Sequence, residues 1–585
     1  MKFKKKKLFT IITIILIVVL LVGVLGYVVL YSRNKEISKN NLTDGWVYKP
    51  NSEKPSKVGI LSGVFSSTAT AGSKYSVAED SATSASNSYL GYEVGGASNI
   101  ENFRKNIKNG YLPISTDITY NGIYSEYYFD TGSRNVNQND MFYPSYSCAV
   151  STNPFSKEQE YYMSIGLNSN IKESDFNRKN VNLVIVLDIS GSMSSSFNSY
   201  YYDQSRSDNI DKNKSKMKIA EESVNNLINK LRPEDRLGIV LFDDDAYLGK
   251  ELSKINETNI DSLKSHILEV EPRGETNFSE GYAKGTSLFS NYLSDNSYQN
   301  RIVVITDAMP NMGDVSENGL SKKINDNADK KIYTSMIGVG VDFNTKLTEK
   351  LSDVKGANYY SVHNAEEFNE ILAEKFDYMI TPLIYDLDLN FKSEDFKIEN
   401  VYGSDSVNKS TGNIMHINTL FPSVRNSSGD VKGGIVVLKL KRIKEAENPD
   451  ISLNISYKDN EEAEHSNSQK VEFKMNTADY YDNAGIRKAI VLARYTNVMK
   501  DWILFERSQK EEFAINEKNE VPEPIYDEDY IKNVLGIHER QSQKLTVCES
   551  YKNIFKELKT YIQSEKNILN DENLNKEVEI IEKLI

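Results

Sequence analysis

The stretch LVIVLDISGS at residues 183–192 decides the fold. Its first five residues are apolar and mostly β-branched, which is typical of a parallel strand buried on both faces of a sheet. The apolar run ends at Asp188, and Ser190 and Ser192 follow at alternate positions. Open α/β sheets bind ligands at the carboxyl ends of their strands. The stretch therefore predicts three oxygen ligands that converge at one strand end.

Two later segments add oxygen ligands of the same kind. The segment GETN at 274–277 precedes a helical pattern, so we expect Thr276 to lie in a loop. The segment RIVVITD at 301–307 predicts a second buried strand that ends at Asp307. Carboxylates and hydroxyls are hard ligands that suit Mg²⁺, Mn²⁺ or Ca²⁺, whereas zinc prefers Cys or His.

The order Asp-x-Ser-x-Ser, then Thr, then a strand-terminal Asp resembles the metal-ion-dependent adhesion site of von Willebrand factor type A (VWA) domains. The resemblance implies that the hydroxyls bind Mg²⁺ directly, or Mn²⁺ or Ca²⁺ in its place, while the aspartates act through bound waters. It also implies a protein ligand whose Asp or Glu carboxylate completes the coordination. The implied metal ligands are Asp188, Ser190, Ser192, Thr276 and Asp307.

Two positions depart from the family pattern. Glu275 stands where the second glycine of Gly-Gly-Thr is usual, and Ala308 stands where a glycine follows the last aspartate. The negative charge of Glu275 is expected to weaken binding of a ligand carboxylate by repulsion.

Residues 176–380 alternate between strand and helix patterns, which predicts a doubly wound, mostly parallel α/β sheet of the VWA or Rossmann-like type. The predicted strands include 237–242, 333–339 and 359–362, and the predicted helices are 217–231, 278–293 and 365–376.

The flanking regions have other patterns. Alternating apolar residues in 381–478 predict an antiparallel, β-sandwich-like module. Helical spacing in 479–585 predicts a helical C-terminal region, in which the apolar stripe around Trp502 either packs in the core or binds a partner. Residues 89–175 resemble the region that precedes the VWA domain in bacterial VWA lipoproteins and membrane proteins, so we expect an associated module there.

The amino terminus predicts a membrane anchor. Residues 8–31 form an apolar run long enough to cross a bilayer, and the lysines within 1–7 keep that short tail cytoplasmic, so the bulk of the chain is expected to be extracytoplasmic. A cleaved signal peptide is the alternative, although its apolar core is usually shorter. The polar, repetitive residues 32–88 predict a flexible stalk.

Two polar loops near the predicted site have alternative interpretations. The segment 193–214, with three tyrosines at 200–202, is either a solvated insertion or a set of partner contacts around the metal. Residues 243–245 are three aspartates, which either form a solvated loop or hold a second cation.

Composition excludes several classes of protein. With 83 acidic and 70 basic residues the net charge is -13, which argues against a nucleic-acid binder. Only Cys148 and Cys548 are present, which rules out a disulfide-rich scaffold and leaves either two free thiols or one bridge.

Catalysis has little support in the sequence. A dehalogenase-like, metal-dependent phosphatase needs a second carboxylate where this chain has Ser190, and the five histidines show no spacing of metal ligands or of a catalytic triad. The sequence predicts a non-enzymatic, membrane-anchored VWA protein of bacterial type that binds a protein ligand through its metal site. The alternative is a scaffold or regulatory subunit of an envelope complex, with the phosphatase a distant third.

Overall fold

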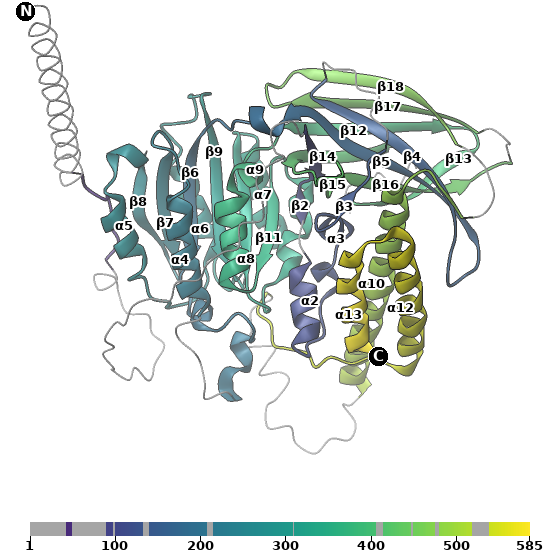
Figure 1. Ribbon diagram of the computed structural model, residues 1–585. Coiled ribbons are helices and arrows are strands. Elements are labelled where there is room, and N and C mark those ends of the chain that lie inside the picture. Colours follow the sequence, from purple (N-terminus) through teal and green to yellow (C-terminus); the bar gives the residue numbers. More distant parts are fainter. Residues whose placement is uncertain are drawn as a thin grey trace, which may run out of the picture.

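The computed structural model describes residues 42–49, 89–97, 100–132, 140–206, 215–307, 309–404, 414–445, 449–473, 479–516 and 538–585. It contains a seven-stranded sheet covered by helices, a ten-stranded sheet beside it, and a layer of helices below the second sheet (Figure 1). Within these ranges no helix is long and apolar enough to cross a membrane. The predicted anchor at 8–31 and the tail at 1–7 lie outside the described residues.

The seven-stranded sheet has the VWA-like α/β fold that the sequence predicts. All neighbouring strands are parallel except the last pair. The strand order is β2 (Gly96–Ala97), β11 (Asn358–Val362), β10 (Ile332–Val339), β9 (Tyr298–Thr306), β6 (Asn180–Asp188), β7 (Arg236–Phe242) and β8 (Ala246–Lys254).

Helices cover both faces of this sheet, which explains why residues 183–187 of β6 are all apolar. Leu183, Ile185 and Leu187 pack with the helices α4 (Lys216–Ile228), α5 (Ile260–Ile267) and α8 (Ala365–Asn369). Val184 and Val186 point to the other face, against α6 (Phe278–Ser287) and α7 (Glu317–Ala328). A strand buried on both faces shows a continuous apolar run and no alternation.

Two predicted helices are shorter than their sequence patterns. The pattern at 278–293 ends as a helix at Ser287 and continues as tight turns, in which the amides of residues 288–290 bond three residues back. The pattern at 365–376 becomes α8, a π-helical turn over Glu370–Glu374, and α9 (Phe376–Ile380). Apolar spacing predicts which face is buried and does not register these changes of turn geometry.

The ten-stranded sheet joins two regions that the sequence presents as separate modules. β1 (Tyr89–Val94) and β5 (Gln159–Lys172) from the region 89–175 lie between strands from the region 381–478. The path is β13 (Phe396–Tyr402), β16 (Ile435–Arg442), β5, β1, β14 (Ile414–Ser423), β12 (Ile384–Ser393), β17 (Asp450–Asp459) and β18 (Glu464–Glu472). β4 (Phe142–Thr152) pairs with β5 and β19 (Tyr480–Tyr481), and all these pairs are antiparallel.

This sheet curls so that distant strands share one core. The rings of Phe142 on β4 and Tyr457 on β17 lie 5.4 Å apart between centroids, although these strands are not paired. The alternation in β12 buries Leu387, Leu389 and Phe391 in that core. A two-stranded ribbon of β3 (Tyr128–Phe129) and β15 (Val431–Lys432) packs against the inner strand β1, where Val431 lies against Gly91. A short helix, α3 (Tyr120–Tyr124), precedes β3 in the chain.

The helical layer consists of α2 (Glu101–Lys108), α10 (Ala484–Asn516), α12 (Glu549–Leu569) and α13 (Asn575–Leu584) (Figure 1). Trp502 of α10 is fully buried, its ring lies edge-on to Phe555, and its Nε1 donates to the carbonyl of Thr546 at 3.3 Å. The stripe around Trp502 is therefore core packing.

Part of the expected stalk contacts the α/β domain. Trp46 pairs with Lys250 of β8 and stacks on the ring of His266, and the nearby Tyr48 is buried. The mostly polar composition of 32–88 predicts a stalk, but Trp46 and Tyr48 provide enough apolar surface for this short part to pack on the domain. The other residues of the expected stalk lie outside the described ranges.

Candidate metal site

The carboxylate of Asp188 is held in place by its own turn and by the next strand. Its Oδ1 accepts the backbone amide of Ser190 at 2.8 Å, and its Oδ2 accepts the hydroxyl of Thr306 at 2.6 Å. Thr306 is the last residue of β9, which lies beside β6 in parallel. The ends of both strands therefore meet at one edge of the sheet, where Asp188 is fully buried.

The two serine hydroxyls lie at the same edge. Ser190 Oγ and Ser192 Oγ are 3.0 Å apart, and Ser192 Oγ donates to Oδ1 of Asp307 at 3.0 Å. The tight turn Gly191–Ser194 directs these side chains to one side. The structure thus brings together Asp188, Ser190, Ser192 and Asp307, four of the five residues that the motif predicts.

Thr276, the fifth residue, lies in a loop that is bound to this turn. The amide of Gly191 donates to the carbonyl of Gly274 at 3.1 Å, and the amide of Arg273 donates to the carbonyl of Ile189 at 2.6 Å. The amide of Thr276 donates to Oδ1 of Asn311 at 2.8 Å. These bonds fix the loop against the turn and leave Thr276 buried.

The three aspartates 243–245 organise this loop. Asp243 accepts Nε of Arg273 at 2.7 Å, and its carbonyl accepts the amide of Asn277 at 2.7 Å. Asp244 lies where a side chain at Gly274 would point, 2.7 Å from the ideal Cβ position. Among the described residues no cluster of three or more His, Cys, Asp or Glu side chains could hold a metal ion. Through their contacts with Arg273, Glu275 and Asn277, Asp243 and Asp244 position the loop that carries Thr276.

A buried lysine that the sequence analysis missed belongs to the site. Nζ of Lys216, at the start of α4, lies 3.0 Å from Oδ2 of Asp307 and 2.6 Å from Oδ1 of Asp342, and all three side chains are fully buried. Burial alone would lower the pKa of Lys216, but the charges of Asp307 and Asp342 raise it. Lys216 therefore carries its charge. The sequence shows it only as one of three lysines at 214–218.

Buried carboxylates outnumber the cations at this edge, where the charge of Arg540 also acts on Asp342. Asp188, Asp307 and Asp342 are three buried carboxylates, and Lys216 supplies one positive charge among them. Burial raises the pKa of Asp188, and the charge of Asp307 raises it further. Buried charges are tolerated when they are paired or coordinate a metal. A divalent cation would balance the remaining charge, and two carboxylates with adjacent hydroxyls are a donor set that suits Mg²⁺, Mn²⁺ or Ca²⁺.

The three tyrosines of the 193–214 segment contact the protein's own chain. Tyr200 is buried and donates to Oδ1 of Asn106 in α2 at 2.6 Å. The amide of Tyr201 donates to Oδ2 of Asp342 at 3.1 Å, and the hydroxyl of Tyr202 donates to Glu539. This part of the loop is neither a solvated insertion nor a free surface of aromatic side chains; residues 207–214 lie outside the described ranges.

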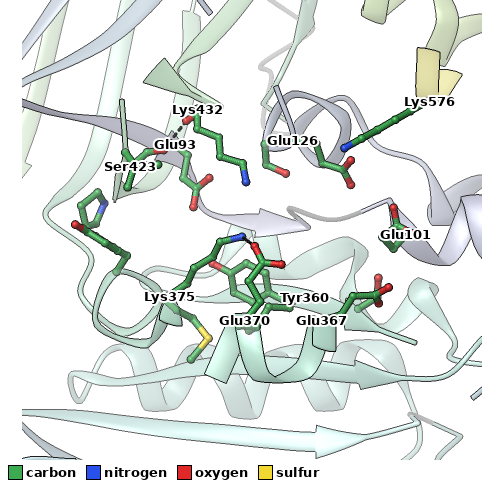
Figure 2. Close-up of a pocket in the computed structure, with 17 residues that line it drawn as sticks. Glu93, Glu101, Glu126, Tyr360, Glu367, Glu370, Lys375, Ser423, Lys432 and Lys576 are labelled. Carbon is green, nitrogen blue, oxygen red and sulfur yellow. Dashed lines mark hydrogen bonds and ion pairs between the residues drawn. The ribbon is translucent and has the colours of Figure 1, made fainter. Parts of the chain in front are cut away.

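A charged cavity of about 340 Å³ lies away from this edge, between β1, α9 and β15 (Figure 2). Lys375 donates to Glu370 across it, and Lys432 also lines it. Burial raises the pKa of Glu93 to about 7, against the opposing charges of Lys432 and Lys375. The cavity carries both signs of charge and lacks the paired hydroxyls of the metal site.

The fold defines a protein with a VWA-like α/β domain. Residues 183–309 match the family model of the von Willebrand factor type A domain, which supports a VWA domain in this part of the chain.

Curated relatives share this region at low identity. The chain is 20% identical over 215 residues to inter-alpha-trypsin inhibitor heavy chain H2 of Homo sapiens, and 22% identical over 216 residues to heavy chain H2 of Mesocricetus auratus. Each match covers 36% of this chain and 21% of the relative, so the chain spans about a fifth of the length of these relatives.

Solved structures of VWA proteins are also similar. A von Willebrand factor type A protein from Catenulispora acidiphila is 14% identical with a TM-score of 0.39, covering 62% of this chain and 82% of that one. The ArnB paralog VWA2 from Sulfolobus acidocaldarius is 14% identical with a TM-score of 0.35, covering 76% of this chain and 97% of that one.

Proposed function

We propose that the VWA domain binds a divalent cation, Mg²⁺ in the first instance, and uses it to bind the Asp or Glu carboxylate of a protein ligand. The residues proposed to hold the ion are Asp188, Ser190, Ser192, Thr276 and Asp307. When bound, such an ion supplies an electrophilic position that accepts an oxygen ligand from a partner. On this proposal the chain acts by binding and catalyses no reaction.

The observation that carries this proposal is the charge imbalance at the end of β6. Asp307 and Asp342 share the ammonium group of Lys216, while the buried carboxylate of Asp188 accepts the Ser190 amide and the Thr306 hydroxyl. Two hydroxyls whose oxygens are 3.0 Å apart lie directly beside these groups. A surplus of buried negative charge is costly unless a cation offsets it.

Metal titration tests the first half of the proposal. The full chain, stripped with EDTA, is expected to bind Mn²⁺ or Mg²⁺ at one site by isothermal titration calorimetry. Asp188→Ala and Thr276→Ala should weaken binding at least tenfold, because each removes an oxygen ligand. Ser265→Ala, which removes an exposed hydroxyl on α5, is the matched control and should bind normally. Equal affinities in all four proteins would refute a metal site here.

Partner capture tests the second half. A protein ligand bridged by the ion should be captured from the intact envelope in Mg²⁺ and lost in EDTA, and Asp188→Ala should lose it as well. Capture that persists unchanged under all these conditions would show that the metal site is not the binding device.

For location, we propose a single-pass membrane protein with residues 1–7 cytoplasmic, 8–31 in the bilayer and the remainder outside. The support is the lysine-rich tail followed by an apolar run of sufficient length. Protease added to intact spheroplasts should digest the VWA domain, while a tag placed before residue 1 should be protected. The reverse pattern of protection would contradict this orientation.

A role as a scaffold or regulatory subunit is the second candidate. It is favoured by the burial of the site, because Asp188, Ser190, Ser192, Thr276 and Asp307 are all between 0% and 6% exposed. A site covered by its own chain suits an internal interface that the metal stabilises. Purification that returns a fixed set of membrane partners, independent of EDTA, would support this role over adhesion.

A further inference from the structure

A short C-terminal segment, residues 538–548, lies across the loops that surround the candidate metal site. Nε2 of His538 lies 2.6 Å from the carbonyl of Val315, and Nδ2 of Asn344 donates to the carbonyl of His538 at 3.1 Å. Arg540 donates to the carbonyl of Phe343 at 2.8 Å. The segment is therefore fixed by several polar bonds to loops that follow β9 and β10.

The same segment is fixed at its other end to the helical layer. The amide of Leu112 donates to the carbonyl of Gln543 at 2.7 Å, and the amide of Leu545 donates to the carbonyl of Gly110 at 2.8 Å. The segment thus links the candidate-site edge of the VWA domain to α2 and α10. It also places the side chain of Glu539 beside the site.

The carboxylate of Glu539 accepts hydrogen bonds from Asn311 and Tyr202. Its Oε1 accepts Nδ2 of Asn311 at 2.6 Å and also accepts the hydroxyl of Tyr202. The other end of the Asn311 amide, Oδ1, accepts the backbone amide of Thr276 at 2.8 Å. One asparagine side chain therefore connects the predicted metal ligand Thr276 to a carboxylate that lies 263 positions later in the chain.

Negative charge gathers around this contact, which favours a cation beside Lys216 and Arg540. Glu539 adds a negative charge beside an edge where Asp188, Asp307 and Asp342 already outnumber Lys216. The charges of Asp307 and Glu539 both act on the hydroxyls of Tyr201 and Tyr202. Like charges that share a buried site repel strongly, whereas a divalent ion between them turns the repulsion into attraction.

The tyrosines also cover the site. The hydroxyl of Tyr201 lies 3.3 Å from where a Cβ on Gly191 would be, so it lies against the turn between Ser190 and Ser192. With the site residues almost fully buried, a ligand from outside reaches the turn only if this cover moves.

We propose that Glu539 is the internal carboxylate of this metal site, and that residues 538–548 occupy, in cis, the position that an external ligand would take. This inference rests on the proposed metal binding. It adds that the carboxylate bound to the ion in the free protein comes from the chain's own C-terminal segment. An external carboxylate then binds in competition with Glu539, so release of the segment controls binding.

The test measures metal affinity in the full, EDTA-stripped chain with Mn²⁺ as the probe. Glu539→Gln removes the charge while keeping the shape, and it is expected to weaken Mn²⁺ binding about tenfold. Glu549→Gln, an exposed glutamate at the start of α12, is the matched control and should bind Mn²⁺ as the unmodified chain does.

Hydrogen exchange supplies a second readout, first in the unmodified chain and then in Glu539→Gln. In the unmodified chain Mn²⁺ should slow amide exchange in 538–548 together with exchange in 188–192, because the ion ties the two segments together. In Glu539→Gln the protection of 538–548 should be lost while that of 188–192 remains.

Three outcomes separate the two proposals. Protection of both segments, lost selectively in Glu539→Gln, supports the internal carboxylate. Mn²⁺ binding that is abolished by Asp188→Ala but unaffected by Glu539→Gln, with metal-independent exchange in 538–548, overturns the internal carboxylate and leaves the metal site intact. Absence of Mn²⁺ binding in the unmodified chain overturns both.

Discussion

Lys216 and Asp307 form an ion pair in which both side chains are fully buried, with Nζ 3.0 Å from Oδ2. The same ammonium group lies 2.6 Å from Asp342. One side chain at the start of α4 therefore contacts the residues that follow β9 and β10. This contact ties the geometry of the metal-site edge to the packing of α4 on the sheet.

Replacing Lys216 by Met should destabilise the metal-free protein by about 3–5 kcal/mol, because it leaves buried carboxylates facing one another without a cation. Saturating Mg²⁺ should recover part of this loss, since the ion offsets the same charges. Urea unfolding with and without Mg²⁺ measures both effects. Lys322→Met, at an exposed position on α7, is the control and should change stability by less than about 1 kcal/mol. Equal losses for the two variants would contradict a central role for Lys216.

Gly274→Ala should damage the loop that carries Thr276. Gly274 has a φ of +69°, and a Cβ there would lie 2.7 Å from Oδ1 of Asp244. Gly45→Ala is a matched control, because Gly45 has a φ of +70° and the atom nearest its Cβ position lies 3.6 Å away, an ordinary van der Waals contact. The control should lose about 1 kcal/mol from backbone strain alone, and Gly274→Ala should lose at least about 1 kcal/mol more from crowding.

The measurement for this pair is thermal unfolding combined with Mn²⁺ titration. Metal affinity should fall in Gly274→Ala and stay unchanged in Gly45→Ala, since the carbonyl of Gly274 accepts the amide of Gly191 in the turn. A fall of the same size in both variants would show that the loop does not position the site.

The core of the α/β domain could be predicted because its signals are local. The apolar run before Asp188 and the run before Asp307 each indicate a buried strand, and parallel strands bring their ends to one edge. Once those strands are neighbours, as β6 and β9 are, the two aspartates and the serines of the turn must lie close together. The parallel direction of β6 and β9 is enough to bring the residues at their carboxyl ends close together.

The remaining features depend on contacts that no local pattern encodes. β1 pairs with β14, more than three hundred residues away, so the regions 89–175 and 381–478 form one sheet although each reads as a separate module. In the sequence Lys216 is one of several nearby lysines, and only the folded structure shows that it contacts Asp307 and Asp342. Glu539 likewise has no distinguishing neighbour in sequence, and its contact with Asn311 spans 228 residues.

Thiol chemistry should distinguish the two cysteines. Cys148 is buried, Cys548 is partly exposed, and neither forms a disulfide in the described structure. A thiol reagent should therefore modify one group rapidly in the native protein and a second group only after unfolding. Cys548→Ser should abolish the rapid phase, and Cys148→Ser should leave it intact. Resistance of both thiols in denaturant, reversed by a reductant, would indicate a bridge that this conformation does not contain.

Glu93 should make stability depend on pH. Burial raises its pKa to about 7 from a reference of 4.5, while Lys432 and Lys375 act in the opposite direction. The folded protein therefore retains a proton that the unfolded chain releases between these two values. The contribution of Glu93 to stability is complete below about pH 4.5 and is lost as the pH rises through 7.

Between pH 5 and pH 8, the unmodified protein should lose about 2 kcal/mol more unfolding free energy than Glu93→Gln, in which this position no longer titrates. Urea unfolding at a series of pH values measures the difference. Glu472→Gln, an exposed position on β18, should follow the unmodified protein across the range. If Glu93→Gln also follows it, the carboxyl is charged throughout this range, and Lys375 and Lys432 stabilise the cavity as its ion-pair partners.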